Sequence, residues 1–189
     1  MIRRSDKPEV FPILLAIWEA SVRATHDFLT EEKIHEIKQI ITEGNVFSSV
    51  ETYTFENADG LKTGFVGIAN QKIEMLFIRP EDRGQGIGKI LTEYVISHHQ
   101  VTKVDVNEQN PQAIGFYKKM GFHVTKRNPL DSQGNPFPIL EMELTSSFIW
   151  ASRLLETRAL LFVLLMGPKP KIHHPTGYGR KFKIDNPGY

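Results

Sequence analysis

The stretch from residue 73 to residue 88 constrains the fold more than any other part of this 189-residue sequence. It begins with the apolar run IEMLFI and Pro80 follows shortly after, which is typical of a buried strand. The glycine-rich sequence RGQGIG comes next, and apolar residues then recur at helical spacing. The stretch therefore predicts a strand, a tight turn and a helix. This arrangement directs backbone N–H groups and a helix dipole at an anion such as a phosphate.

Two common phosphate-binding loops do not fit this turn. A Walker A loop needs G-x-x-x-x-G-K-[ST], but Gly84 and Gly88 are too close together, and Ile90 stands where the hydroxyl is needed. The dinucleotide fingerprint G-x-G-x-x-G would need a third glycine at the position of Lys89. The glycines instead remove Cβ atoms, so that backbone N–H groups can reach a pyrophosphate.

A second motif, VDVNEQNPQAIGFYKKMGF, covers residues 104–122. Asn110 suits a helix N-cap, and Pro111 is favoured at the first helical position. Gly121 stands where a glycine commonly ends a helix. The motif therefore predicts a strand followed by a short, well-delimited helix.

Together the two motifs resemble the GCN5-related N-acetyltransferases. The first matches their acyl-CoA signature [R/Q]-x-x-G-x-[G/A] at 83–88, and the second matches N-x-x-A-x-x-F-Y-x-x-x-G-F at 110–122. Residues 1–144, above all 18–29 and 106–110, are similar to small bacterial members of the YjaB type. The resemblance implies an α/β (α+β) acyl-CoA N-acyltransferase fold, with a mixed, mostly antiparallel central sheet flanked by about four helices.

The resemblance implies acetyl-CoA as co-substrate. The acyl-pantetheine arm is expected along the strand 76–78, with a backbone N–H near Phe77 or Ile78 polarising the thioester carbonyl. The pyrophosphate is expected on the N–H groups of 83–89. The implied cofactor-binding residues are Leu76, Phe77, Ile78, Arg83, Gly84, Gln85, Gly86, Ile87, Gly88, Lys89, Asn107 and Asn110.

Three residues are candidates for proton transfer. The resemblance places Tyr117 beside the cofactor sulfur, where its phenol would protonate the departing thiolate, although the residue also suits packing beside Phe116. Glu74, expected on the same strand face as Leu76 and Ile78, is a candidate general base. His26, in the loop between two predicted helices, is the other, although an isolated loop histidine is more often a bystander.

The expected function is direct transfer of an acetyl group from acetyl-CoA to a primary amine in a ternary complex, because the chain has no cysteine nucleophile. The alternative is a non-catalytic acyl-CoA-binding or sensing module that docks a partner. Small amines, peptide N-termini, lysines and aminoglycosides all remain possible acceptors. We expect no metal site, no nucleic-acid partner and no membrane segment, and a cytoplasmic protein that could form a homodimer.

The remaining pattern completes the expected fold. A first strand is predicted at 2–4, a helix at about 7–23 with a capping box from Asp6 to Glu9, and a second helix from Thr30 to Gly44. Strand periodicity begins at Val46, and an antiparallel meander then leads through two turns to the apolar strand. A closing strand is predicted at 138–144.

Residues 145–189 differ from the acetyltransferase-like part in composition. They hold seven Lys and Arg against two acidic residues, whereas residues 1–144 hold 16 against 20. A helix is predicted at about 147–166, apolar on every side at 159–166, and a loose Pro- and Gly-rich tail follows. We interpret 145–189 as a basic extension of a 1–144 domain. A docking or dimerisation helix, a basic arm and an accidental extension are the three alternatives.

Overall fold

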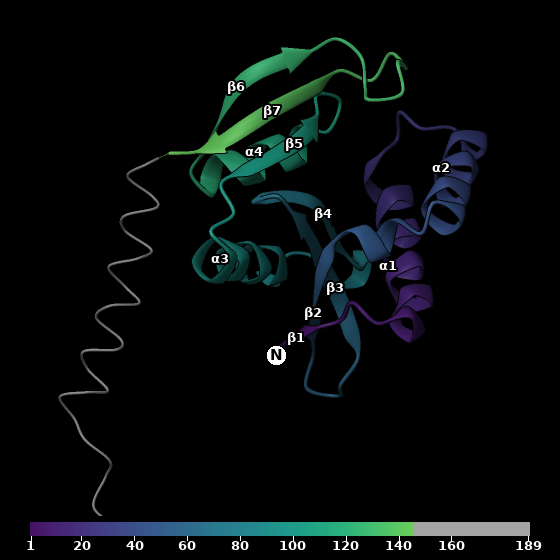
Figure 1. Ribbon diagram of the computed structural model, residues 1–189, viewed down its shortest axis with the longest axis vertical. Coiled ribbons are helices and arrows are strands. Elements are labelled where there is room, and N and C mark those ends of the chain that lie inside the picture. Colours follow the sequence, from purple (N-terminus) through teal and green to yellow (C-terminus); the bar gives the residue numbers. More distant parts are fainter. Residues whose placement is uncertain (146–189) are drawn as a thin grey trace, which may run out of the picture. The chain divides into compact units, whose positions relative to one another are not determined.

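The computed structural model describes residues 1–145, so the predictions for the helix at 147–166 and the tail lie outside the described residues. A seven-stranded sheet runs through the described part in the order β1-β2-β3-β4-β5-β7-β6 (Figure 1). Only β4 and β5 pair in parallel, which confirms the mixed, mostly antiparallel sheet. The strands are β1 (Ile2–Arg4), β2 (Glu51–Glu56), β3 (Lys62–Ala69), β4 (Lys72–Ile78), β5 (Lys103–Asn107), β6 (Phe122–Asn128) and β7 (Ile139–Leu144).

Helices cover both faces of the sheet. They are α1 (Phe11–Thr25), α2 (Glu31–Glu43), α3 (Ile87–His99) and α4 (Pro111–Lys119), with short 3-10 segments at Pro8–Val10, Val46–Ser49 and Pro80–Asp82. Phe65 packs into the core beneath α1 and α2, whereas the next residue, Val66, packs into the core beneath α3 and α4. Consecutive strand residues point to opposite faces, so β3 is buried on both sides. No helix among residues 1–145 is long and apolar enough to span a bilayer.

The predicted helix ends are confirmed where a side chain or a glycine makes them. The Thr30 hydroxyl accepts a hydrogen bond from the Lys33 N–H at 3.3 Å, and the Asn110 carboxamide accepts one from the Ala113 N–H at 3.0 Å. Gly121 has a φ of +90° just after α4. These signals are local, which is why the sequence alone reveals them.

Two local predictions are wrong. Asp6 does not cap a helix, because its carboxylate accepts a hydrogen bond from Arg4 Nε at 2.8 Å and the chain enters α1 through a 3-10 turn. The strand predicted from Val46 begins only at Glu51. The residues before it form a 3-10 turn, because this brings Phe47 into the core beneath α1 and α2.

Strand β4 contains a bulge at Glu74. Gly67 of β3 lies opposite Met75, whereas the next residue, Ile68, lies opposite Ile73, so Glu74 has no partner in the ladder. The bulge interrupts the alternation of side chains. Glu74 is therefore not held on the same face as Leu76 and Ile78 by strand periodicity, contrary to the sequence prediction.

Candidate active site

The turn between β4 and α3 presents open space and free backbone donors. Gly84 and Gly86 have φ values of +79° and +81°, and a Cβ built at either position would meet nothing within 4 Å. Among residues 1–145, no acceptor takes the N–H groups of residues 84–86. Gly86 is the N-cap of α3 and brings no capping side chain, so the first-turn N–H groups of that helix also remain available. This cradle suits a pyrophosphate.

Beside this turn, the end of β4 has an open edge. Leu76, Phe77 and Ile78 pair with β3 on one side. On the other side, β4 pairs with β5 only at Lys72 and Ile73, whereas the opposite edge of β5 pairs with β7 along its whole length. The backbone groups of 76–78 that face β5 therefore have no strand partner in the described chain. Such an edge can pair with an extended amide-containing ligand.

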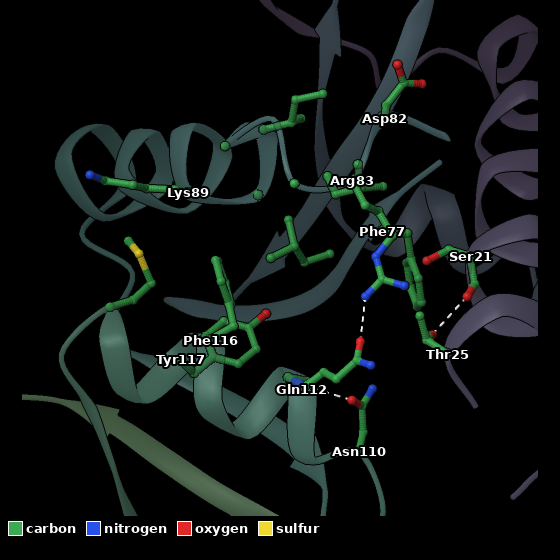
Figure 2. A pocket seen from close by; sticks show the side chains of 18 of the residues that line it. Ser21, Thr25, Phe77, Asp82, Arg83, Lys89, Asn110, Gln112, Phe116 and Tyr117 are labelled. Atoms are coloured by element: carbon green, nitrogen blue, oxygen red, sulfur yellow. Dashed lines mark hydrogen bonds between the residues drawn. The ribbon is translucent and has the colours of Figure 1, made fainter. Parts of the chain in front are cut away.

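These features border one cavity of about 570 Å³. Its walls come from the end of β4, the glycine turn, one face of α4 and the C-terminal end of α1 (Figure 2). Arg83 crosses between two of these walls, since its guanidinium donates to the Gln112 side chain at 2.7 Å. The cavity has the size of a small-molecule site, and the glycine turn at its rim adds the anion cradle.

Tyr117 is the strongest candidate for proton transfer in this cavity. Its side chain is only 6% exposed, and its ring makes edge contacts with Phe116 and Phe122 at centroid distances of 5.0 and 5.6 Å. The hydroxyl points into the cavity (Figure 2). Burial raises the pKa of this phenol above its ordinary value of 10.0. Tyr117 is therefore protonated at neutral pH and can donate its proton.

His26 lines the cavity from the α1 side. It follows the last residue of α1, and its ring packs on Phe28 at a centroid distance of 5.3 Å. Burial lowers the pKa of this imidazole below 6.5, while a hydrogen bond to the Val22 carbonyl and the charge of Asp27 act in the opposite direction. The ring is consequently neutral at neutral pH.

The structure brings most of the sequence-predicted site residues together, but three lie away from the cavity wall. Glu74 forms an ion pair with Lys72 at 3.2 Å, and the Asn107 side chain accepts from the Gln109 N–H at 2.8 Å. Gln85 also does not line the cavity. The predicted residues that do line it are His26, Leu76, Phe77, Ile78, Arg83, Gly84, Gly86, Ile87, Gly88, Lys89, Asn110 and Tyr117. Among residues 1–145, no group of three metal-binding side chains occurs.

Sequence reasoning missed eight wall residues, for two different reasons. Ser21, Thr25 and Asp82 come to the wall through packing between distant segments, and no local pattern reveals this. Projecting the helix from Tyr117 would have found Ala113 and Met120, four residues before it and three after it, among the other five, which lie on or directly after α4. These five are Gln112, Ala113, Phe116, Lys119 and Met120.

Comparisons with known proteins agree with this geometry. A family model described as an acetyltransferase (GNAT) domain matches residues 26–146. The peptidyl-lysine N-acetyltransferases YjaB of Salmonella typhimurium and of Escherichia coli K12 are each 40% identical over 141 residues, which cover 75% of this chain and 95% and 94% of theirs. The solution structure of apo YjaB from Escherichia coli superposes with a TM-score of 0.69 at 38% identity, covering 77% of this chain and 97% of that one.

The family model covers more than half of this chain, and the similarity to YjaB extends along nearly all of that protein. The fold and the cavity have three features that the sequence resemblance led us to expect: a glycine turn, an open strand edge and a tyrosine at the cavity. The chain therefore belongs to the GNAT family and is an N-acetyltransferase that transfers an acetyl group to an amine.

Proposed function

We propose that this enzyme acetylates the ε-amino group of lysine in peptides or proteins, with acetyl-CoA as the acetyl donor. The relatives that share 40% identity are named peptidyl-lysine N-acetyltransferases, which supports the lysine acceptor. Membership of the GNAT family and the glycine cradle support acetyl-CoA. The cytoplasmic location and the homodimer expected from the sequence stay predictions.

The backbone provides the binding groups. Free N–H groups at residues 84–86 and in the first turn of α3 would hold the pyrophosphate, with the positive end of the helix dipole adding to the attraction. The open edge at 76–78 would pair with the amides of the pantetheine arm. Acetyl-CoA, when bound, supplies the acetyl group as a thioester. An N–H at Phe77 or Ile78 would then polarise the thioester carbonyl, and such a donor contributes about 3 kcal/mol to a transition state.

Tyr117 would act as the general acid. The observation that carries the proposed acetyl transfer is the position of the Tyr117 hydroxyl. Its hydroxyl enters the same cavity whose wall includes the open edge of β4, and its phenol is held in the protonated form by burial. A proton from Tyr117 would make the departing thiolate a better leaving group. Because the chain has no cysteine, direct attack by the amine replaces a cysteine-bound acyl-enzyme.

The acceptor is tested with a matched pair of peptides. Both have a blocked N-terminus, and they differ only in one residue, lysine or arginine. We expect CoA release with the lysine peptide alone, and every thiol detected comes from CoA because the protein has none. Acetylation of a peptide with a free N-terminus and no lysine would instead assign the activity to α-amino groups.

Binding of the donor is tested separately by unfolding the protein with and without acetyl-CoA. A ligand at about 100 times its dissociation constant adds roughly 2.7 kcal/mol to the free energy of unfolding. A stabilised protein that acetylates none of a broad panel of amines would favour the non-catalytic acyl-CoA-binding module. A folded protein without stabilisation would contradict the acetyl-CoA site itself.

A further inference from the structure

The C-terminal end of α1 forms one wall of the cavity and holds a short chain of hydrogen bonds. Ser21, Thr25 and His26 all border the cavity. Figure 2 shows Ser21 and Thr25 on α1, across the cavity from Tyr117 on α4. A group acting from this wall would therefore meet a bound acceptor from the side opposite the proposed general acid.

The hydrogen bonds determine which nitrogen of His26 carries the proton. Thr25 Oγ1 lies 2.8 Å from the Ser21 carbonyl oxygen, which can only accept, so the Thr25 hydroxyl donates its single proton there. Thr25 Oγ1 also lies 2.8 Å from His26 Nδ1. With its proton already used, this oxygen accepts from Nδ1–H. The Val22 carbonyl accepts from the His26 backbone N–H at 2.9 Å.

Nε2 of the neutral ring consequently has an unshared electron pair. Among residues 1–145, no side chain or backbone group forms a hydrogen bond with this nitrogen. Packing against Phe28 fixes the ring plane further. Glu74, the other candidate base, lies off the cavity wall in an ion pair with Lys72. The end of α1 therefore presents a neutral base at the cavity, whereas the bulge of β4 does not.

We propose that His26 is the general base of the reaction and that Thr25 is a positioning residue that holds its Nδ1–H tautomer. The inference rests on the proposed lysine acetylation. His26 Nε2 accepts one proton from the lysine ammonium group and becomes an imidazolium. The freed amine forms the C–N bond at the acetyl carbon while the C–S bond breaks. Tyr117 gives its proton to the departing sulfur and recovers one from the amide nitrogen, and His26 releases its proton to water.

The direct test is His26→Asn, which keeps an N–H donor near Thr25 Oγ1 and removes Nε2. We expect turnover of the lysine peptide to fall by about 100-fold or more, with the stabilisation by acetyl-CoA unchanged. At saturating substrates, the wild-type rate should lose activity on the acid side as His26 is protonated, and the variant should lack this step. An unchanged turnover in a folded variant would overturn the proposal.

The positioning role of Thr25 has its own matched pair. Thr25→Val removes the hydroxyl at constant shape, and Thr25→Ser restores it. We expect Thr25→Val to lower kcat by about tenfold, the loss that one ordinary hydrogen bond can explain, with little change in KM for acetyl-CoA, and Thr25→Ser to recover most of the rate. Equal rates in Thr25→Val and wild type would contradict the positioning role.

A readout independent of activity is ¹⁵N NMR of the imidazole nitrogens, with the His26 signals assigned by their loss in His26→Asn. We expect a neutral Nδ1–H tautomer in the wild type and a mixture of tautomers in Thr25→Val. A wild-type Nε2–H tautomer would overturn the base assignment even if the peptide is acetylated. If the wild type binds acetyl-CoA but acetylates no lysine peptide, the proposed function fails, and the base assignment fails with it.

Discussion

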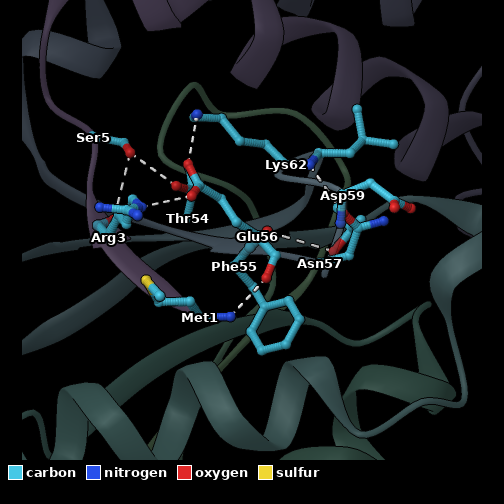
Figure 3. Close-up of polar contacts among 11 residues, drawn as sticks. Met1, Arg3, Ser5, Thr54, Phe55, Glu56, Asn57, Asp59 and Lys62 are labelled. Carbon is cyan, nitrogen blue, oxygen red and sulfur yellow. Dashed lines mark hydrogen bonds and ion pairs between the residues drawn. The ribbon is translucent and has the colours of Figure 1, made fainter.

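Two turns of this chain share a backbone conformation but differ in what their N–H groups contact. Gly60, between β2 and β3, has a φ of +78°, and Gly86, between β4 and α3, has a φ of +81°. A Cβ built at either glycine would meet nothing within 4 Å. In the β2–β3 turn, however, Asn57 accepts from the N–H groups of Asp59, Gly60 and Leu61 at 3.0, 3.2 and 2.9 Å (Figure 3).

The β4–α3 turn has no internal acceptor of this kind in residues 1–145. Its N–H groups at residues 84–86 have no acceptor there, and Gly84 and Gly86 line the cavity. A glycine with positive φ therefore marks a tight turn in both places, and only the unused donors distinguish a binding loop from a connection. A substitution in or near one turn can therefore be compared with a matched substitution in or near the other.

The largest expected effect comes from two tyrosines, Tyr117 on α4 at the cavity and Tyr53 on β2, the strand before the β2–β3 turn. Tyr117→Phe removes the proposed proton donor at the cavity and should lower kcat by about 10²- to 10⁴-fold, with acetyl-CoA affinity nearly unchanged. Tyr53→Phe on β2 removes a hydroxyl that donates to Glu51 at 3.1 Å, away from the cavity, and should leave kcat unchanged. Steady-state kinetics on both variants checks this pair. Unaltered turnover in Tyr117→Phe would remove Tyr117 from the mechanism.

The two glycines give the next largest effect. Gly86→Ala and Gly60→Ala each force an alanine into a left-handed conformation, which should cost both proteins about 1–2 kcal/mol of unfolding free energy. Only Gly86→Ala also places a methyl group in the expected pyrophosphate site, and we expect it to weaken acetyl-CoA binding by at least about tenfold.

Calorimetric titration and urea unfolding separate the two consequences of the glycine substitutions. Equal losses of stability with unequal losses of affinity would support the difference between the turns. Equal acetyl-CoA affinities in Gly86→Ala and Gly60→Ala would show that the free N–H groups at the β4–α3 turn do not bind the donor.

The same contrast explains how much the sequence could predict. The glycine turn, the Asn110 cap and the Tyr117 motif are encoded by residues close together in the chain, and the structure has each element where the sequence places it. The mixed, mostly antiparallel sheet with about four helices follows from the family resemblance that these motifs carry. An asparagine at a turn is expected to accept hydrogen bonds from nearby backbone N–H groups, as Asn57 does. By contrast, the absence of acceptors around residues 84–86 is visible only in the folded chain.

The failures of prediction depend on partners that are distant in sequence. The bulge at Glu74 exists only through the register between β3 and β4, so strand periodicity assigned it to a face incorrectly. The 3-10 turn at 46–49 exists because Phe47 packs against Phe11 and Phe65 at centroid distances of 5.5 and 6.0 Å. Thr25 borders the cavity only because α1 packs against β4.

A smaller effect is expected when the β2–β3 turn loses its internal acceptor. Asn57→Ala leaves the N–H groups of Asp59 and Leu61 to water and should lower the free energy of unfolding by about 1 kcal/mol. The new free donors lie away from the cavity, so acetyl-CoA affinity should not change. An altered affinity in Asn57→Ala would show that the two turns are coupled and would weaken them as mutual controls.

The smallest effect concerns Glu56, the last residue of β2, which directly precedes the β2–β3 turn. Its carboxylate accepts from Lys62 Nζ at 2.8 Å and from Arg3 Nε at 2.6 Å (Figure 3). The hydrogen bonds from Lys62 and Arg3 lower the pKa of Glu56 below its ordinary value of 4.5, although burial opposes them.

The folded protein therefore binds a proton at Glu56 less readily than the unfolded chain does. The resulting stabilisation is present above pH 4.5 and is lost as the pH falls through the lower folded pKa. Glu56→Gln should lower Tm slightly at pH 7, and its difference from wild type should shrink as the pH is lowered towards 3. Thermal unfolding across this range measures the difference, and acetyl-CoA affinity at pH 7 serves as the control. A Tm difference that grew at acid pH would mean that another group, not the Glu56 carboxylate, titrates in this pH range.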